Sequence, residues 1–239
     1  MAKRPTEPLD ADSTRLDTVL ADLRALATTK TRDGMARFAI PSTHALGVAV
    51  GDIRDLGKRI GRDHALAVSL WSTGVYEARM LAAFVDEPAR VTPAQMDHWI
   101  AETDNWAICD HVCFHLFDRT PHAFARVTAW ADRPEEFVKR GAFALLAALA
   151  LHDKAAPDDA FLACLPLIPR AADDERNFVK KGVSWALRAI GRRNARLNDA
   201  AVPVALALAA SSAPAPRWVG KDALRELTSA AVVARLARP

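Results

Sequence analysis

Glycine, aromatic residues and cysteine are scarce in this chain of 239 residues, which has ten glycines, 7% aromatics and three cysteines. Few glycines and almost no β-branched runs leave no segment with the alternation of a strand, so the composition favours helix almost throughout. The odd number of cysteines (Cys109, Cys113 and Cys164), with no C-x-x-C spacing, argues against a disulfide framework or a thiolate zinc site. We expect reduced, buried thiols in a cytoplasmic protein.

Other absences narrow the class of protein further. No apolar run reaches the length of a membrane span, and the first twelve residues lack the apolar region of a signal peptide. We expect residues 1–12 to be a flexible N-terminal tail. The chain has no G-x-S-x-G, phosphate loop or H-E-x-x-H, and His111 and His115 form a metal-binding spacing without a third ligand. We therefore expect neither a metal nor an organic cofactor.

The residues that are present predict one helical domain over residues 13–239. Half of the chain is apolar, which is enough for a sizeable core, and loops are short throughout. We predict about a dozen helices, the first capped by Ser13, another starting at Thr92-Pro93 and a third running over 158–168. An alanine-rich helix is expected after Asn198, with Pro203 tolerable only near its first turn.

An internal repeat predicts how these helices are arranged. The segment Phe137–Gly141 (FVKRG) recurs as Phe178–Gly182 (FVKKG), an offset of 41 residues, and both copies open an apolar helix. An offset near 40 with paired helices is the period of HEAT and armadillo repeats. We therefore predict an all-α fold, an α-α superhelix (solenoid) of HEAT-like repeats with an extended concave face.

Aromatic and charged residues share the helix faces that the predicted core leaves free. Trp106 and Asp110, four residues apart, lie on one face, away from the apolar stripe of Ile108, Val112 and Leu116. Lining up the repeats places four charged residues in a column that could line the concave face: Arg79, Asp110, Arg140 and Lys181.

A second helix combines an aromatic residue with cations, because Lys181, Trp185 and Arg188 fall on one face. They belong to a basic run with no acidic residue: Arg176, Lys180, Lys181, Arg188, Arg192, Arg193 and Arg196. A basic surface with interleaved aromatics suits a nucleic-acid backbone.

Each of these residues also has a structural explanation. Trp106 and Trp185 are the kind of residue that packs between repeats. Asp110 could cap a helix or pair with Arg140, and Arg140 could pair with Glu136 four residues earlier. A basic run is usually a solvated face.

Taken together, the motifs resemble the DNA alkylation repair glycosylases of the AlkD type. The resemblance runs from about Met35 to Glu226, and its motifs occur in the same order. They are Met35-Ala36-Arg37-Phe38, Leu46-Gly47-Val48, Leu70-Trp71, Tyr76-Glu77-Ala78-Arg79, Trp106 with Asp110, the Arg140 helix and the segment Lys180–Arg188.

The resemblance implies a HEAT-like solenoid that removes cationic alkylpurines, such as 3-methyladenine and 7-methylguanine, from duplex DNA in base excision repair. It implies that Asp110 is the essential carboxylate, that Trp106 and Trp185 contact the deoxyribose of the lesion, and that Arg140 holds the adjacent phosphate. Phe38 stands where the family usually has tyrosine. The family is described as acting without drawing the base into a pocket, unlike most glycosylases.

The resemblance also implies a partner and a location. We expect alkylated duplex DNA as partner and a monomer in the cytoplasm, associated with the nucleoid. The basic helices add expected DNA contacts at Lys139, Lys180, Lys181 and Arg188.

Two other functions stay open at this stage. One is a non-catalytic relative that binds distorted or branched DNA, which Phe38 leaves possible. The other is a protein-interaction scaffold, which would give the basic run no purpose.

Overall fold

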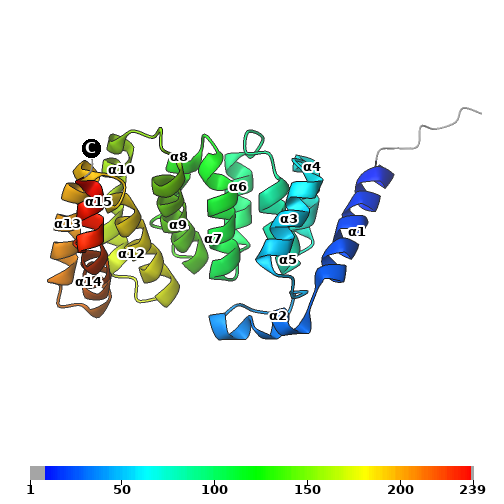
Figure 1. The fold of residues 1–239 in the computed structure, drawn as a ribbon, viewed down its shortest axis with the longest axis horizontal. Coiled ribbons are helices and arrows are strands. Elements are labelled where there is room, and N and C mark those ends of the chain that lie inside the picture. Colours follow the sequence, from blue (N-terminus) through cyan, green and yellow to red (C-terminus); the bar gives the residue numbers. More distant parts are fainter. Residues whose placement is uncertain (1–8, 238–239) are drawn as a thin grey trace, which may run out of the picture. The chain divides into compact units, whose positions relative to one another are not determined.

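The computed structural model describes residues 9–237, and this part of the chain is helical without any strand (Figure 1). The all-α prediction is confirmed. The first helices are α1 (Leu9–Leu26), α2 (Thr29–Asp33), η1 (Ala36–Phe38, a 3₁₀ helix), α3 (Val50–Ile60), α4 (His64–Ser72) and α5 (Tyr76–Val85). Next come α6 (Pro93–Ala101), α7 (Trp106–His115), η2 (Phe117–Arg119, also 3₁₀), α8 (Ala123–Trp130), α9 (Glu136–His152) and α10 (Asp158–Cys164). The last are α11 (Leu167–Ala172), α12 (Asn177–Gly191), α13 (Ala195–Ala209), α14 (Pro214–Leu227) and α15 (Ala230–Leu236).

The chain divides into two compact units, with the boundary between Val91 and Thr92. The expectation of one domain over residues 13–239 stays a prediction. Within the described residues, no helix is both long and apolar enough to cross a membrane.

In the first unit, the carboxylate of Glu77 organises the loop before α3. Its oxygens accept hydrogen bonds from the backbone N–H groups of Leu46, Gly47 and Val48, at 2.8, 2.7 and 3.2 Å. Gly47 has φ +95°, and a Cβ there would lie 2.3 Å from the carbonyl oxygen of Thr28, so only glycine fits. The fully buried acid is therefore a structural group that satisfies three backbone donors.

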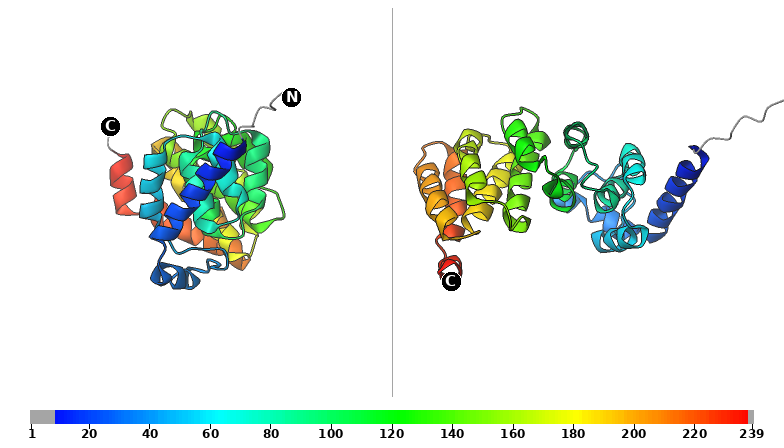
Figure 2. Two further views of the ribbon diagram at one scale, coloured as in Figure 1. Left: turned by 90° about the vertical axis from the view of Figure 1, so that its right-hand side faces the viewer. Right: turned by 90° about the horizontal axis from the view of Figure 1, so that it is seen from above.

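The second unit is built around α9 and α12, which pack along each other (Figures 1 and 2). These are the two helices that open with the repeated pentapeptide. The rings of Phe137 and Phe178 lie 5.7 Å apart, and Val138 and Val179 are both buried. The repeat in the sequence is therefore a repeat in the structure.

Three predicted helix boundaries are wrong. Helix α1 begins at Leu9, so Ser13 lies inside it, and only residues 1–8 of the expected tail fall outside the described part. Helix α13 is capped by Asn194, whose side chain accepts the N–H of Leu197 at 2.9 Å, so Pro203 stands well inside the helix. Packing of α13 against α14 offsets the cost of an interior proline. The helix expected over 158–168 is divided into α10 and α11 near Pro166.

Gly141 permits the close approach of α9 to α6, because a Cβ there would lie 2.6 Å from Cδ1 of Ile100. We expect Gly141→Ala to destabilise the fold by about 1–3 kcal/mol through overpacking, measured by denaturant unfolding. Gly182 is the matched control, since it holds the same place in the next repeat and its nearest neighbours lie at 3.6 Å. A Gly141→Ala variant as stable as Gly182→Ala would contradict this explanation.

Candidate nucleic-acid interface and active site

Helix α7 presents a face of partly exposed side chains opposite its buried stripe. Its start is set by Asn105, whose Oδ1 accepts the N–H groups of Ala107 and Ile108 at 3.0 Å each. The predicted stripe of Ile108, Val112 and Leu116 is buried, as are the thiols of Cys109 and Cys113. Trp106 and Asp110 are half-buried on the remaining face, and Phe114 follows at the same four-residue spacing.

The carboxylate of Asp110 is held by the guanidinium of Arg140 on α9. Nε of Arg140 donates to Oδ1 at 2.8 Å, and Nη2 donates to Oδ2 at 2.6 Å. Nη1 donates to the carbonyl oxygen of Phe178 on α12 at 2.7 Å, and only 6% of Arg140 is exposed. One arginine therefore joins three helices, and its partner is Asp110 rather than Glu136.

This pair is electrostatically unusual because both groups are withdrawn from water. Burial raises the pKa of the Asp110 carboxyl, and the charge and hydrogen bonds of Arg140 act against that rise. Burial also disfavours charged Arg140, but Asp110 outweighs it and raises the pKa of the guanidinium. The ionised state of Asp110 therefore depends on Arg140.

Phe114 connects the α7 face to Trp185 on α12. The two rings are stacked, with centroids 4.8 Å apart and planes 10° from parallel. Trp185 remains half-buried and keeps part of its surface accessible. Phe114 is not among the predicted site residues, although its spacing of eight residues from Trp106 places it on the same helix face.

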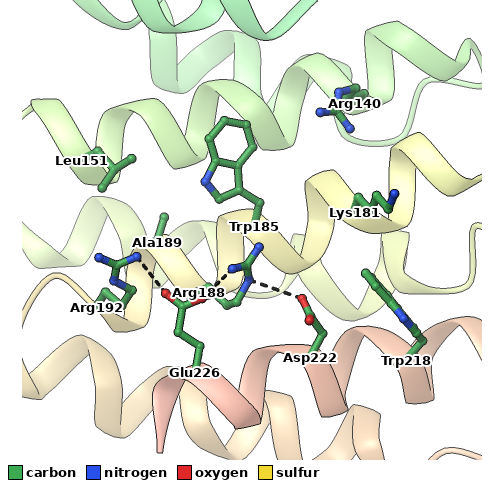
Figure 3. A pocket seen from close by; sticks show the side chains of 10 residues that line it. All are labelled: Arg140, Leu151, Lys181, Trp185, Arg188, Ala189, Arg192, Trp218, Asp222 and Glu226. Atoms are coloured by element: carbon green, nitrogen blue, oxygen red, sulfur yellow. Dashed lines mark hydrogen bonds and ion pairs between the residues drawn. The ribbon is translucent and has the colours of Figure 1, made fainter. Parts of the chain in front are cut away.

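A pocket of about 440 Å³ lies beside this aromatic stack (Figure 3). Trp185, Lys181 and Arg140 line it, whereas Trp106 and Asp110 do not. Trp218 and Asp222 enter from α14, and Arg188 extends from α12 toward them. The complete lining is Arg140, Leu151, Lys181, Trp185, Arg188, Ala189, Arg192, Trp218, Asp222 and Glu226.

The basic run has no acidic residue in the sequence, but in the structure carboxylates lie next to most of its residues. Neighbouring helices and loops supply the carboxylates. The ion pairs are Arg176 with Asp174, Arg188 with Asp222 and Glu226, Arg192 with Glu226, and Arg196 with Asp158 and Asp159. Arg193 donates instead to the carbonyl oxygens of Ala150 and Ala156.

The three lysines predicted to contact DNA differ in whether their ammonium groups are free to bind a phosphate. The ammonium of Lys139 lies 3.1 Å from the carboxylate of Asp174, and its side chain is only 17% exposed. Lys180 lies 5.4 Å from the centroid of the Trp218 ring. Lys181 is exposed and forms no ion pair within residues 9–237.

Two residues of the predicted set lie in the first unit. Phe38 is 52% exposed, and the guanidinium of Arg37 lies 4.8 Å from its ring centroid. Arg79, from the predicted column, lies over the ring of Trp71. Within the second unit, Asp110 contacts Arg140, and Arg140 and Lys181 line one pocket, while the column along the concave face stays a prediction.

His111 and His115, the pair with a metal-binding spacing, lie next to each other on α7. The rings of His111 and His115 are 4.4 Å apart. In the part of the chain that the structure describes, no three His, Cys, Asp or Glu residues are placed to hold a metal ion.

Comparison with known proteins gives the chain a family. The family model described as "DNA alkylation repair enzyme" matches residues 19–227. A solved structure described as "a new family of proteins related to the HEAT-like repeat DNA glycosylases with affinity for branched DNA structures" is 20% identical, with a TM-score of 0.72 over 80% of this chain and 82% of that one. This similarity confirms the predicted HEAT-like fold.

A designed armadillo repeat protein is 16% identical and has a TM-score of 0.35 over 75% of this chain and 93% of that one. No curated protein matches the chain. Because the family model covers most of its length, the chain belongs to the DNA alkylation repair enzyme family.

Proposed function

We propose that the protein is a DNA glycosylase that hydrolyses the N-glycosidic bond of cationic alkylated purines, including 3-methyladenine and 7-methylguanine, in duplex DNA. One observation carries the proposal: the carboxylate of Asp110 is half-buried, paired with Arg140, and shares its helix face with Trp106. Family membership supports the same chemistry. The protein would act as a monomer in base excision repair, on the DNA of the nucleoid in the cytoplasm.

The substrate explains why one carboxylate is enough. A cationic purine leaves with the electron pair of the C1′–N bond and becomes neutral, so no general acid has to protonate it, in contrast to ordinary glycoside hydrolysis. The sugar left behind is an oxocarbenium-like cation. Asp110 would stabilise that charge and orient the water that attacks C1′. The proton of the attacking water would pass to bulk water as the new C–O bond forms.

The aromatic side chains fit the same transition state. An indole face attracts a nearby cation by about 0.5–2 kcal/mol, depending on how far water is excluded. Trp106 is carried on the same face of α7 as Asp110. Trp185 is held by its stack on Phe114, which fixes the orientation of the indole before the substrate arrives.

Arg140 can support Asp110 and hold a phosphate at the same time. A guanidinium has five N–H groups. Three are used, by the two oxygens of Asp110 and the carbonyl of Phe178. One hydrogen on Nη1 and one on Nη2 are left for a phosphate, and Arg140 lines the pocket from which a backbone would approach.

The proposed phosphate contacts next to Arg140 are Lys180 and Lys181. Lys181 is the stronger candidate, because its ammonium is exposed and pairs with no carboxylate of the described residues. Arg188 and Lys139 would first have to release Glu226 and Asp174. We therefore rank Arg188 and Lys139 below Lys181 as proposed DNA contacts.

Non-catalytic binding of branched DNA is the second candidate function. The solved structure of similar fold is described as having affinity for branched DNA. In addition, Phe38 lacks the hydroxyl of the tyrosine usual in AlkD-type enzymes. A member that binds such DNA without cleaving glycosidic bonds would share the fold of this chain.

The test incubates the protein with duplex DNA treated with a methylating agent and measures free 3-methyladenine and 7-methylguanine by mass spectrometry. We expect time-dependent release of both bases above the spontaneous rate. Binding to a four-way junction and to a plain duplex is measured in parallel. Tight junction binding without any release would favour the second candidate, and binding to neither DNA would favour a protein-interaction scaffold.

A further inference from the structure

Trp218 is a large aromatic side chain that the proposed chemistry does not use. It lies on α14 and is 37% exposed, although tryptophan is usually mostly covered. Its indole lines the same pocket as Trp185, which comes from α12 (Figure 3). The pocket therefore has indoles on two of its helices.

Cations gather at the Trp218 side of the pocket. In Figure 3, Lys181 and Arg140 lie on the same side as Trp218, and the Arg192–Glu226 pair lies on the other. Lys181 is exposed and has no carboxylate partner among the described residues. Lys181 holds the repeat position of Arg140, which faces the carboxylate of Asp110. In the next repeat, Arg140 takes the place that Asp110 has beside Arg140. Lys181 therefore has a cation instead of a carboxylate at this position, and the charge of Lys181 is left uncompensated.

The rest of the lining is polar but balanced in charge. Arg188 pairs with Glu226 and Asp222, and Arg192 pairs with Glu226 at 2.8 Å (Figure 3). Burial alone would raise the pKa of Glu226, but the hydrogen bond and charges of these arginines lower it, so the carboxylate stays ionised. Leu151 adds apolar surface. This side of the pocket offers donors and acceptors with little net charge.

Together, the two indoles, the balanced polar side and the unpaired cation of the pocket are complementary to a single nucleotide. An unstacked nucleobase has two π faces for indoles, a polar edge for donors and acceptors, and a phosphate for an unpaired cation. A volume of about 440 Å³ falls in the range of small-ligand sites, roughly 300–1,000 Å³.

We propose that this pocket receives a single unstacked nucleobase of bound DNA, which stacks on Trp218 while its phosphate contacts Lys181. The proposal rests on the proposed function only in taking DNA as the partner. It assigns Trp218 a binding role separate from Asp110 and Trp106, which do not line the pocket. It also departs from the AlkD-type expectation that no base enters a pocket.

The test compares two duplexes that carry 2-aminopurine, one with the base as a single-nucleotide bulge and one with it fully paired. Affinity is measured by fluorescence anisotropy, and stacking by quenching of the 2-aminopurine emission. We expect the wild-type protein to bind the bulged duplex about tenfold more tightly, with quenching, because stacking one base on an aromatic side chain has an effect of this order.

Variants at the pocket distinguish stacking of a base on Trp218 from non-specific binding of DNA. Trp218→Ala is expected to lose the preference of about tenfold and most of the quenching, while Trp218→Phe keeps much of both. Leu206→Ala is the matched control, because Leu206 is 55% exposed on α13 and lies outside the pocket. It should bind both duplexes as the wild type does. Circular dichroism confirms that each variant is folded.

Three results would overturn the proposal. The first is equal affinity of the wild-type protein for both duplexes. The second is an equal loss for both in Trp218→Ala. The third is equally tight binding of free 2-aminopurine deoxynucleotide, which would assign the pocket to free nucleotides. If one of these results is found but the protein still releases methylated bases, only the proposed role of the pocket is overturned. If the protein binds no DNA at all, the proposed function is overturned as well.

Discussion

Replacing Asp110 with asparagine is expected to lower the rate of methylated-base release by about 10²–10³-fold, the usual effect of removing one electrostatic group aimed at transition-state charge. The amide keeps the size of the side chain but cannot stabilise a cationic sugar. Single-turnover release of 7-methylguanine is the measurement. If release persists at the wild-type rate, Asp110 is not the catalytic carboxylate.

The same substitution disturbs the fold, so activity alone does not identify the role of Asp110. It leaves the guanidinium of Arg140 buried beside a neutral amide, and breaking a buried pair in this way typically costs about 3–5 kcal/mol. The double variant Asp110→Asn/Arg140→Gln removes both charges. We expect it to recover much of the lost free energy of unfolding but none of the lost activity. Recovery of both would make the role of Asp110 structural.

Replacing Arg140 with glutamine is expected to move the acid limb of the pH–rate profile to higher pH. Burial raises the pKa of Asp110, and in the variant no guanidinium opposes that rise. The proposed catalysis needs the ionised carboxylate, so activity is lost as the pH falls through the pKa of Asp110. Because that pKa is higher in the variant, the loss begins at a higher pH.

Stability should respond to pH in the opposite direction. A carboxyl with a higher pKa in the folded than in the unfolded chain binds its proton more tightly when folded. The contribution of Asp110 to the stability of the variant is therefore largest below the unfolded pKa of about 3.9, and it is lost as the pH rises through the folded pKa. Acidification of Arg140→Gln should thus raise its melting temperature relative to wild type while lowering its activity.

Lys181→Gln is the matched control for this experiment. Lys181 occupies the equivalent repeat position and lines the same pocket, but it does not contact Asp110. Removing the charge of Lys181 should leave the acid limb of the pH–rate profile in place. It should also reduce the slope of log affinity against log salt concentration by about 1, the effect of losing one phosphate contact. Equal displacement of the acid limb in both variants would mean that the effect comes from the general field of the pocket.

Local periodicity was sufficient to predict most of the helices and the face of α7. The positions of Ile108 and Val112 are dictated by burial, so Trp106 and Asp110 had to lie elsewhere on the same helix. The repeat at Phe137 and Phe178 predicted two neighbouring helices, because identical apolar positions pack in identical ways. The fold class follows from such short-range signals.

Ion pairs between side chains of different helices were much less predictable. From the sequence, Arg140 could pair with Asp110 or with Glu136, and the spacing does not decide between them. The outcome depends on the rotation of α9, which brings Arg140 against α7. In the same way, Glu226 lies 38 residues after Arg188, so no local window reveals that it neutralises the basic run.

Helix ends that depend on side-chain caps were also missed. Asn194 and Asn198 are equally good candidates by residue type, and packing of α13 on α14 favours the earlier one. The same packing keeps Pro203 inside the helix. Tertiary contacts therefore override a local preference of about 3 kcal/mol.

The paired arginines of the basic run also bear on how such a surface would meet a long polyanion. Counterions are released from duplex DNA only when its phosphates are neutralised by available cations. Arg188, Arg192 and Arg196 already hold carboxylates, which leaves few such cations on this face. Contact with ordinary duplex DNA through this surface would gain little from counterion release, so the protein would leave undamaged stretches quickly.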